Sequence, residues 1–383
     1  MEVLPPLSLY IHFPWCVQKC PYCDFNSFTL HGALPERAYL EALQRDLARQ
    51  APPLEGRPVI SVFLGGGTPS LFPPRALAEL FAFVRRHYAL AGDAEITLEA
   101  NPGTIERGRF AEYRDAGITR VSLGAQSFDA QTLKRLGRIH GPDEIRIAAE
   151  ELHAAGLDNF NLDLMFALPG QDVAGALRDL DDALALAPAH LSHYQLTLEP
   201  GTVFAGLPPP QLPDEELAWT MQDACHERLA ATGFEQYEVA AFARAGRQCA
   251  HNLNYWRFGD YVGAGAGAHG KLTHREPWRI VRTQQTREPR RYLAQAGDGP
   301  AEEILAPDAL PFEFALNALR LTQGFDPALF PERTGATVDR VSPTFDRLQA
   351  RGLLEKFGPG RLRPTPLGAR FLNDAIAAFL PDR

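Results

Sequence analysis

The sequence lacks long apolar segments. No run of about 18 or more apolar residues occurs in the 383-residue chain, and its first residues, MEVLPPLSLY, contain no basic segment followed by an apolar one. A transmembrane helix needs about 20 consecutive apolar residues. We therefore expect neither a membrane span nor a secretory signal peptide, and we expect the protein to be cytoplasmic.

Basic residues and cysteines are also scarce. The chain has 38 Lys and Arg against 47 Asp and Glu, a formal net charge of -9. Binding to nucleic-acid phosphates requires an excess of basic surface, which argues against a general nucleic-acid binder. The cysteines number five, an odd count and too few for the disulfide framework of a secreted protein. Reduced thiols that ligate a metal fit this composition better.

The first half of the chain alternates short apolar runs with longer amphipathic helical patterns. This alternation is typical of βα units and a parallel sheet, and 45% hydrophobic residues are enough for a large core. The helices are expected at Pro35 to Gln50, Arg75 to His87 and Ile105 to Ala116. Six strands are expected, at Leu7 to Phe13, Val59 to Leu64, Glu95 to Ala100, Thr119 to Gly124, Asn159 to Phe166 and Leu191 to Leu198.

The second half predicts a smaller domain. Proline-rich residues 207–213 form an expected connector before a helix from Asp214 to Ala231, and the last part of the chain shows helices, a short hairpin and a final helix, an order similar to a winged-helix domain. We predict an α/β fold, an incomplete (β/α)6 TIM-like barrel of parallel strands with a C-terminal helical, winged-helix-like domain. The expected division is 1–240 for the barrel, 241–290 for a linker segment and 291–383 for the C-terminal domain.

Chemically suggestive residues stand where the predicted strands end. Cysteines follow the first strand, Gly65 to Thr68 the second and Gln126 the fourth, while Glu99 and Asp163 lie on the third and fifth. The carboxyl ends of parallel barrel strands form one face, so these residues are expected to converge. The sequence therefore predicts one site.

Three of the cysteines, Cys16, Cys20 and Cys23, form a C-x3-C-x2-C pattern. Thiolates this close together bind soft metals, chiefly zinc or an iron-sulfur cluster. Structural zinc usually shows two separated ligand pairs, although His12 offers a fourth ligand for a Cys3His set. A four-iron cluster with three cysteines keeps one iron open for a small molecule. The cluster is the favoured interpretation, and zinc stays as an alternative.

The cysteine pattern, with Tyr22 directly before the last cysteine, resembles the radical S-adenosylmethionine (SAM) superfamily. That resemblance implies a 4Fe-4S cluster whose open iron is chelated by SAM and whose electron cleaves SAM to a 5'-deoxyadenosyl radical. The later segments LEANPGT, GAQSF, LGR and NLDLMFALPGQ are similar to the coproporphyrinogen oxidase-like branch of the superfamily. By this resemblance the SAM contacts are Tyr10, Gly66, Gly67, Thr68, Glu99, Gln126, Arg138 and Asp163.

The segment HNLNYW, residues 251–256, matches an HNxxYW motif of the haem chaperone branch of this family. The resemblance implies that the protein binds haem and delivers it to haem-requiring apoproteins, with the cluster and SAM promoting transfer. Imidazole is a common axial ligand of haem iron, so His251 is the candidate ligand. Cys249 is a rival thiolate, and His269 ranks below His251.

Two other functions stay open, and with them the question whether the protein is an enzyme. One is an oxygen-independent coproporphyrinogen III oxidase; in that branch a fourth cysteine follows the third, where this chain has Asp24, and an N-terminal extension precedes the first strand, expected here at Leu7. The other is a zinc-stabilised regulatory module. The family resemblance also implies a flavodoxin or ferredoxin type electron donor, and peripheral contact with a membrane-bound recipient is left open.

Overall fold

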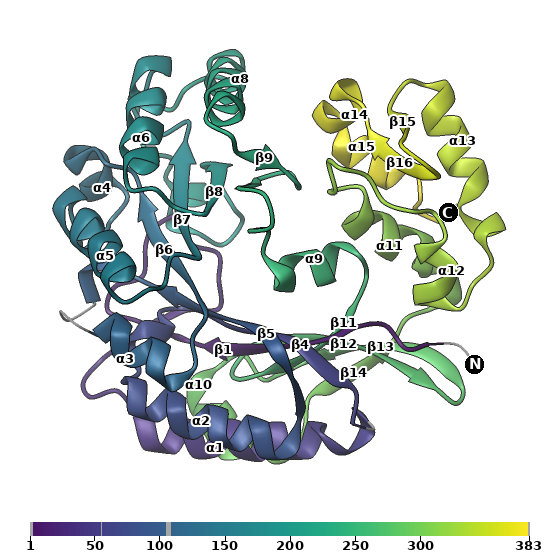
Figure 1. Cartoon of the computed structure of the whole chain (residues 1–383), viewed down its shortest axis with the longest axis horizontal. Helices are drawn as coiled ribbons and strands as arrows, with labels where there is room; N and C mark the ends of the chain where they lie inside the picture. The colour runs from purple at the N-terminus through teal and green to yellow at the C-terminus, as the bar shows by residue number, and fades with distance from the viewer. Residues whose placement is uncertain (1–2, 55, 105–108, 382–383) are drawn as a thin grey trace.

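The computed structural model describes residues 3–54, 56–104 and 109–381. In this part of the chain a 12-stranded sheet has the order β14-β13-β12-β11-β1-β4-β5-β6-β7-β8-β10-β9 (Figure 1). Its strands are β1 (Leu7–Phe13), β4 (Pro58–Gly66), β5 (Ala89–Ala100), β6 (Arg120–Gln126), β7 (Phe160–Phe166), β8 (His190–Gln195), β9 (Glu235–Gln236), β10 (Ala241–Ala243), β11 (Asp260–Ala264), β12 (His269–Arg275), β13 (Trp278–Gln284) and β14 (Ala301–Ile304).

The six expected strands are the parallel core of this sheet. Neighbours in the chain order β1, β4, β5, β6, β7, β8 pair in parallel, which confirms the partial TIM-like barrel. Of the predicted helix Ile105 to Ala116, only the part from Arg109 lies within the described residues. The helices of this half are α1 (Glu36–Gln50), α2 (Pro74–His87), α3 (Arg109–Ala116), α4 (Ala130–Arg135), α5 (Pro142–Ala154), α6 (Val173–Ala185), α7 (Val203–Gly206) and α8 (Glu215–Ala231).

Residues 241–290, expected as a linker segment, contribute strands to the sheet. β11 pairs in parallel with β1, and β12 and β13 extend that edge in antiparallel fashion. A Cβ atom at Gly263 would overlap the carbonyl oxygen of His269, so glycine is required for the close crossing of β11 and β12. The glycine-rich composition therefore marks close packing within a sheet, and the domain boundaries at 240 and 290 stay a prediction.

The C-terminal region contains the helices and the hairpin that the sequence predicts, while two short helices stand where one final helix was expected. Its aromatic core includes Phe314, Phe325 and Phe345, together with Phe258 and Ile280 from the segment beside β11 and from β13, so this domain packs onto the end of the sheet. Its elements are α11 (Leu310–Ala318), α12 (Leu329–Thr334), α13 (Ser342–Ala350), β15 (Leu354–Phe357), β16 (Arg361–Pro364), α14 (Pro366–Arg370) and α15 (Leu372–Ala377).

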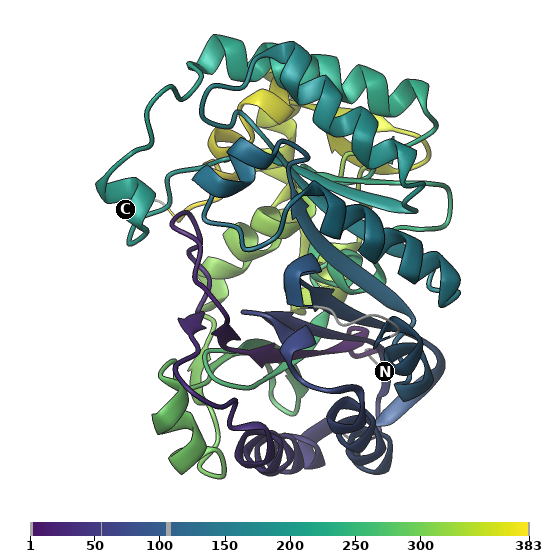
Figure 2. The same cartoon turned by 90° about the vertical axis from the view of Figure 1, so that its left-hand side faces the viewer.

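Two further features position the site. Helix α9 (Ala250–Trp256) lies between the sheet and the C-terminal domain (Figure 1). The loop after β1 extends to the segment at α7, where the Phe204 N–H donates to the Pro21 carbonyl at 3.0 Å (Figure 2).

Within the described residues, no helix combines the length and apolar character needed to span a bilayer.

Candidate functional site

The three clustered cysteines lie on one loop that is closed at its stem. Cys16 is in the short strand β2 (Trp15–Cys16), which pairs with β3 (Phe28–Thr29). The Phe28 N–H donates to the Pro14 carbonyl at 2.7 Å, and the Leu30 N–H donates to the Cys16 carbonyl at 2.8 Å. This closure holds the segment that carries the other two thiols at the carboxyl end of β1.

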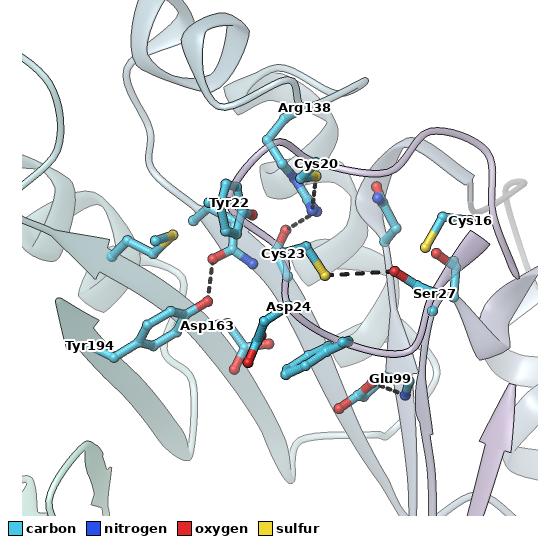
Figure 3. Close-up of a pocket in the computed structure, with 18 of the residues that line it drawn as sticks. Cys16, Cys20, Tyr22, Cys23, Asp24, Ser27, Glu99, Arg138, Asp163 and Tyr194 are labelled. Atoms are coloured by element: carbon cyan, nitrogen blue, oxygen red, sulfur yellow. Dashed lines mark hydrogen bonds between the residues drawn. The ribbon is translucent and has the colours of Figure 1, made fainter. Parts of the chain in front are cut away.

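The loop covers a cavity of about 450 Å³, a volume typical of small-molecule sites. Residues from the ends of β4, β5, β6 and β7 line it together with the thiols. Glu99 of β5 and Asp163 of β7 are seen on the side away from the cysteine loop (Figure 3). The structure thus brings together ten residues that the sequence singled out: Cys16, Cys20, Cys23, Gly66, Gly67, Thr68, Glu99, Gln126, Arg138 and Asp163.

The donor set fits an iron-sulfur cluster. All three cysteines are free, and burial raises the pKa of the Cys16 and Cys23 thiols, so metal binding has to displace their protons. One guanidinium nitrogen of Arg138 lies 3.5 Å from Cys20 Sγ, where it can offset thiolate charge (Figure 3). In the described part of the chain, no three His, Cys, Asp or Glu side chains converge as ligands of a single metal ion.

The ring of His12 is held by two hydrogen bonds. Its Nδ1 lies 2.9 Å from the Tyr10 hydroxyl and its Nε2 lies 2.9 Å from the Asn26 carbonyl oxygen, so both ring nitrogens are engaged. Burial lowers the pKa of His12 to about 4, which keeps the ring neutral at pH 7. The Cys3His zinc alternative gains no support from this arrangement.

The glycine turn after β4 joins the cysteine loop to the sheet. The Gly66 N–H donates to Glu99 Oε2 at 2.9 Å, and the Gly67 N–H donates to the Phe13 carbonyl at 2.7 Å. Gly66 has φ of 112°, in the left-handed region that favours glycine. An ammonium group is itself a hydrogen-bond donor, so at this turn it would be bound by carbonyl or carboxylate oxygens, which are acceptors.

Two carboxyl groups lie in the wall of the cavity beside this turn. Burial, followed by the nearby Asp163 charge, raises the pKa of Glu99 to about 8. Burial also raises the pKa of Asp163, whose carboxylate accepts hydrogen bonds from Asn161 at 2.8 Å and from Ser122 at 3.3 Å. A cationic ligand would favour the ionised form of both groups.

Gln126 is held in a strained position at the end of β6. Its φ of 71° is unusual for a residue other than glycine, and the register between β6 and β7 shifts between Gly124 and Gln126. The Tyr194 hydroxyl donates to Gln126 Oε1 at 2.7 Å (Figure 3). Strain of this kind is frequent at functional sites.

The sequence reasoning missed Tyr194 and Ser122, both of which line the cavity. Tyr194 lies on the sixth predicted strand, the one strand to which no site residue was assigned. Polar side chains near the carboxyl ends of barrel strands face one site. This signal, which predicted the other residues, was sufficient to predict Tyr194.

Tyr10 and His251 lie outside the cysteine cavity. Tyr10 lines a neighbouring cavity instead. His251 lines neither: it is 1% exposed, its Nδ1 lies 3.0 Å from Ser61 Oγ and its Nε2 lies 2.7 Å from the Tyr255 hydroxyl. Burial lowers the pKa of His251 to about 3. Ligation of iron by His251 would have to break one of these hydrogen bonds, and its role stays a prediction.

The fold and the three-thiol cavity define a radical SAM protein. The family model described as the radical SAM superfamily matches residues 10–183, and the model of the HemN C-terminal domain matches residues 305–371. The solved structure of coproporphyrinogen III oxidase HemN from Escherichia coli has a TM-score of 0.82 with this chain, covering 98% of this chain and 90% of that one at 22% identity, which shows the shared fold.

Relatives over the whole length define the family more closely. The chain is 48% identical to the heme chaperone HemW of Escherichia coli (strain K12) and 45% identical to that of Haemophilus influenzae, with 100% of each chain covered in both comparisons. The chain belongs to the HemW family of radical SAM proteins.

Proposed function

We propose that this protein is a haem chaperone that binds a 4Fe-4S cluster, SAM and haem and delivers haem to apoproteins. The observation that carries the proposal is the 48% identity over the full length to the heme chaperone HemW of Escherichia coli. The cavity that gathers three free thiols and the strand-end residues supports the part of the proposal that concerns the cluster and SAM.

Different residues of this cavity bind the cluster and SAM in this proposal. In this proposal Cys16, Cys20 and Cys23 hold the cluster, and bound cluster and SAM supply one-electron chemistry. Arg138, beside Cys20, offsets negative charge and can pair with a carboxylate of SAM.

The strand-end residues supply the remaining SAM contacts in this proposal. The carboxylates of Glu99 and Asp163 are acceptors for ribose hydroxyls or an ammonium group, and Gln126 supplies an amide. The loop stem and the glycine turn hold these groups in fixed positions before the ligand binds.

Coproporphyrinogen III oxidase activity is the function to be distinguished from chaperone activity. The likeness to that enzyme is one of fold, at 22% identity. Asp24 lines the cavity at the position where the resemblance places a fourth cysteine in the oxidases. We propose that this protein therefore lacks oxidase activity.

The test uses the full-length protein purified and reconstituted without oxygen. We expect iron and sulfide in equal amounts, a Soret band that shifts when haem is added, and recovery of activity when the haem-loaded protein is mixed with the haem-free form of a respiratory haem enzyme. Cys23→Ser should lose the cluster, whereas Cys225→Ser, a buried cysteine on α8, should retain it.

The same preparation tests the alternative. Incubation with coproporphyrinogen III, SAM and a reductant should leave the substrate unchanged; formation of protoporphyrinogen would replace the chaperone proposal by the oxidase. A flavodoxin or ferredoxin type electron donor and a cytoplasmic location complete the proposal. Co-sedimentation with vesicles that carry a haem-requiring membrane protein tests peripheral contact.

A further inference from the structure

A second cavity of about 460 Å³ lies next to the cysteine cavity. The two share four lining residues, Asp24 and Phe25 of the cysteine loop, Gly66 of the glycine turn, and Glu99. A ligand in the second cavity would therefore contact the same loop that carries the cysteines, on its other side.

The walls of the second cavity combine aromatic rings with basic side chains. Tyr255 and Tyr261 lie with their ring centroids 4.3 Å apart, and Tyr10 and the exposed Phe25 add further rings. Arg287 is exposed at the rim. Aromatic rings pack on the face of a flat macrocycle, and a guanidinium pairs with carboxylates. This combination suits a planar aromatic ligand that bears carboxylate groups.

Two histidines line this cavity, His12 and His269 of β12. Both ring nitrogens of His12 are engaged in hydrogen bonds, so His269 is the candidate ligand of a metal. Its side chain is exposed, and among the described residues its ring has no hydrogen-bond partner. Partial burial, together with the positive charges of Arg282 and Arg287, lowers the pKa of His269, which favours the neutral ring that ligates metals. The ring of His269 therefore has a nitrogen lone pair available for a metal, whereas both ring nitrogens of His251 are engaged in hydrogen bonds.

We propose that haem binds in this second cavity, with His269 as an axial ligand of the iron and Arg287 as a partner of the propionates. The proposal rests on the proposed function, because it requires that the protein binds haem. It deepens that function by assigning the haem site to the side of the cysteine loop opposite the SAM site, with Asp24 and Phe25 between them.

The test compares three histidine variants of the full-length, anaerobically reconstituted protein. Each is titrated with haem and followed by optical absorption and by low-temperature magnetic spectroscopy, which identifies imidazole ligation. His269→Ala removes the proposed ligand, and His251→Gln keeps a hydrogen-bonding side chain at the motif position. His274→Ala is the matched control, because it lies on β12 five residues away and on the opposite face of the strand.

We expect His269→Ala to lose the imidazole-ligated spectrum and to recover it when free imidazole is added, while His251→Gln and His274→Ala keep it. Loss in His251→Gln with retention in His269→Ala would overturn the proposal and leave the proposed function intact. Absence of haem binding by the unmodified protein would overturn both. The cluster absorbance, measured in every sample, shows that each variant is folded.

Arg287→Gln tests the propionate contact independently. We expect this variant to keep the ligand spectrum but to bind haem more weakly, and to bind the dimethyl ester of haem as well as the unmodified protein does. Equal loss of affinity for haem and for the ester would contradict a contact between Arg287 and the propionates.

Discussion

Replacement of Glu99 by glutamine should remove a pH-dependent penalty on folding of the ligand-free protein. Burial raises the pKa of Glu99 from 4.5 to about 8. A carboxyl group with a raised folded-state pKa keeps its proton in the folded state while the unfolded chain loses it. The free energy of unfolding therefore falls as pH rises from about 4.5 to about 8 and then levels.

The size of the effect follows from the pKa shift. The full shift corresponds to an upper limit of about 5 kcal/mol in the free energy of unfolding. Water in the cavity screens the half-buried carboxyl group, so we expect about 2 kcal/mol at pH 8. The charge of Asp163 adds to the pKa shift of Glu99. Asp163 is unchanged in the variant, so its own effect on the free energy of unfolding is present in both proteins.

Urea denaturation of the reduced, cluster-free protein at several values between about pH 5 and about pH 8 measures this difference. The stability of Glu99→Gln relative to the unmodified protein should grow across this range. Glu303→Gln, an exposed carboxyl group on the edge strand β14, is the control and should follow the unmodified protein. A Glu99→Gln difference that is constant or shrinks with rising pH would refute the reasoning.

Three further changes test interactions at the site and at the opposite end of β1. Gly67→Ala places a Cβ atom 2.6 Å from a backbone carbonyl oxygen of the cysteine loop and should cost about 1–3 kcal/mol in urea denaturation. Tyr194→Phe removes the hydrogen bond to Gln126 and should weaken SAM binding about fivefold in equilibrium dialysis. Lys271→Met leaves Asp260 with one buried cation fewer and should lower stability by about 3 kcal/mol.

Two of these changes have a matched control variant, and for Tyr194→Phe a second measurement on the same variant is the control. Gly92→Ala introduces a Cβ atom that meets nothing within 4 Å, so it should leave stability unchanged. Lys356→Met removes an exposed lysine of β15 in place of a buried one. Tyr194→Phe should bind haem as the unmodified protein does, since Tyr194 lines the cysteine cavity but not the second cavity. Equal effects in a variant and its control would contradict the packing argument for that residue.

The parallel core was predictable because its strands are buried on both faces. Such strands read as short, nearly continuous apolar runs, and β1 was predicted to the residue at Leu7–Phe13. β11 was missed because glycine interrupts its five residues, DYVGA, and glycine in a sequence favours a loop. Its strand character comes from pairing with β1, a tertiary contact between distant segments.

Most members of the cysteine cavity were predictable because topology brings strand ends together, whereas Arg138, between α4 and α5, was predicted from the family resemblance alone. Their partners were not, since a hydrogen bond such as that from Tyr194 to Gln126 joins residues on separate strands and leaves no local pattern. The glycine turn was predictable in part. Its composition predicted a close backbone approach, but the structure shows that the approach is to the cysteine loop and that Glu99 accepts the Gly66 N–H.

The HNxxYW motif is accounted for by its position on α9. Residues four apart on a helix share a face, so His251 and Tyr255 lie together. The imidazole of His251 is hydrogen-bonded to the Tyr255 hydroxyl at 2.7 Å and to Ser61 Oγ of β4 at 3.0 Å, and it thereby connects the two residues. The adjacent Trp256 packs with the C-terminal core under Arg320, 4.4 Å from the ring centroid. The motif thus holds Tyr255 at the second cavity while it ties the sheet to the C-terminal domain. A histidine that positions an aromatic wall of the haem site would affect haem binding without touching the iron, which is why the ligand spectrum, and not affinity alone, has to decide between His251 and His269.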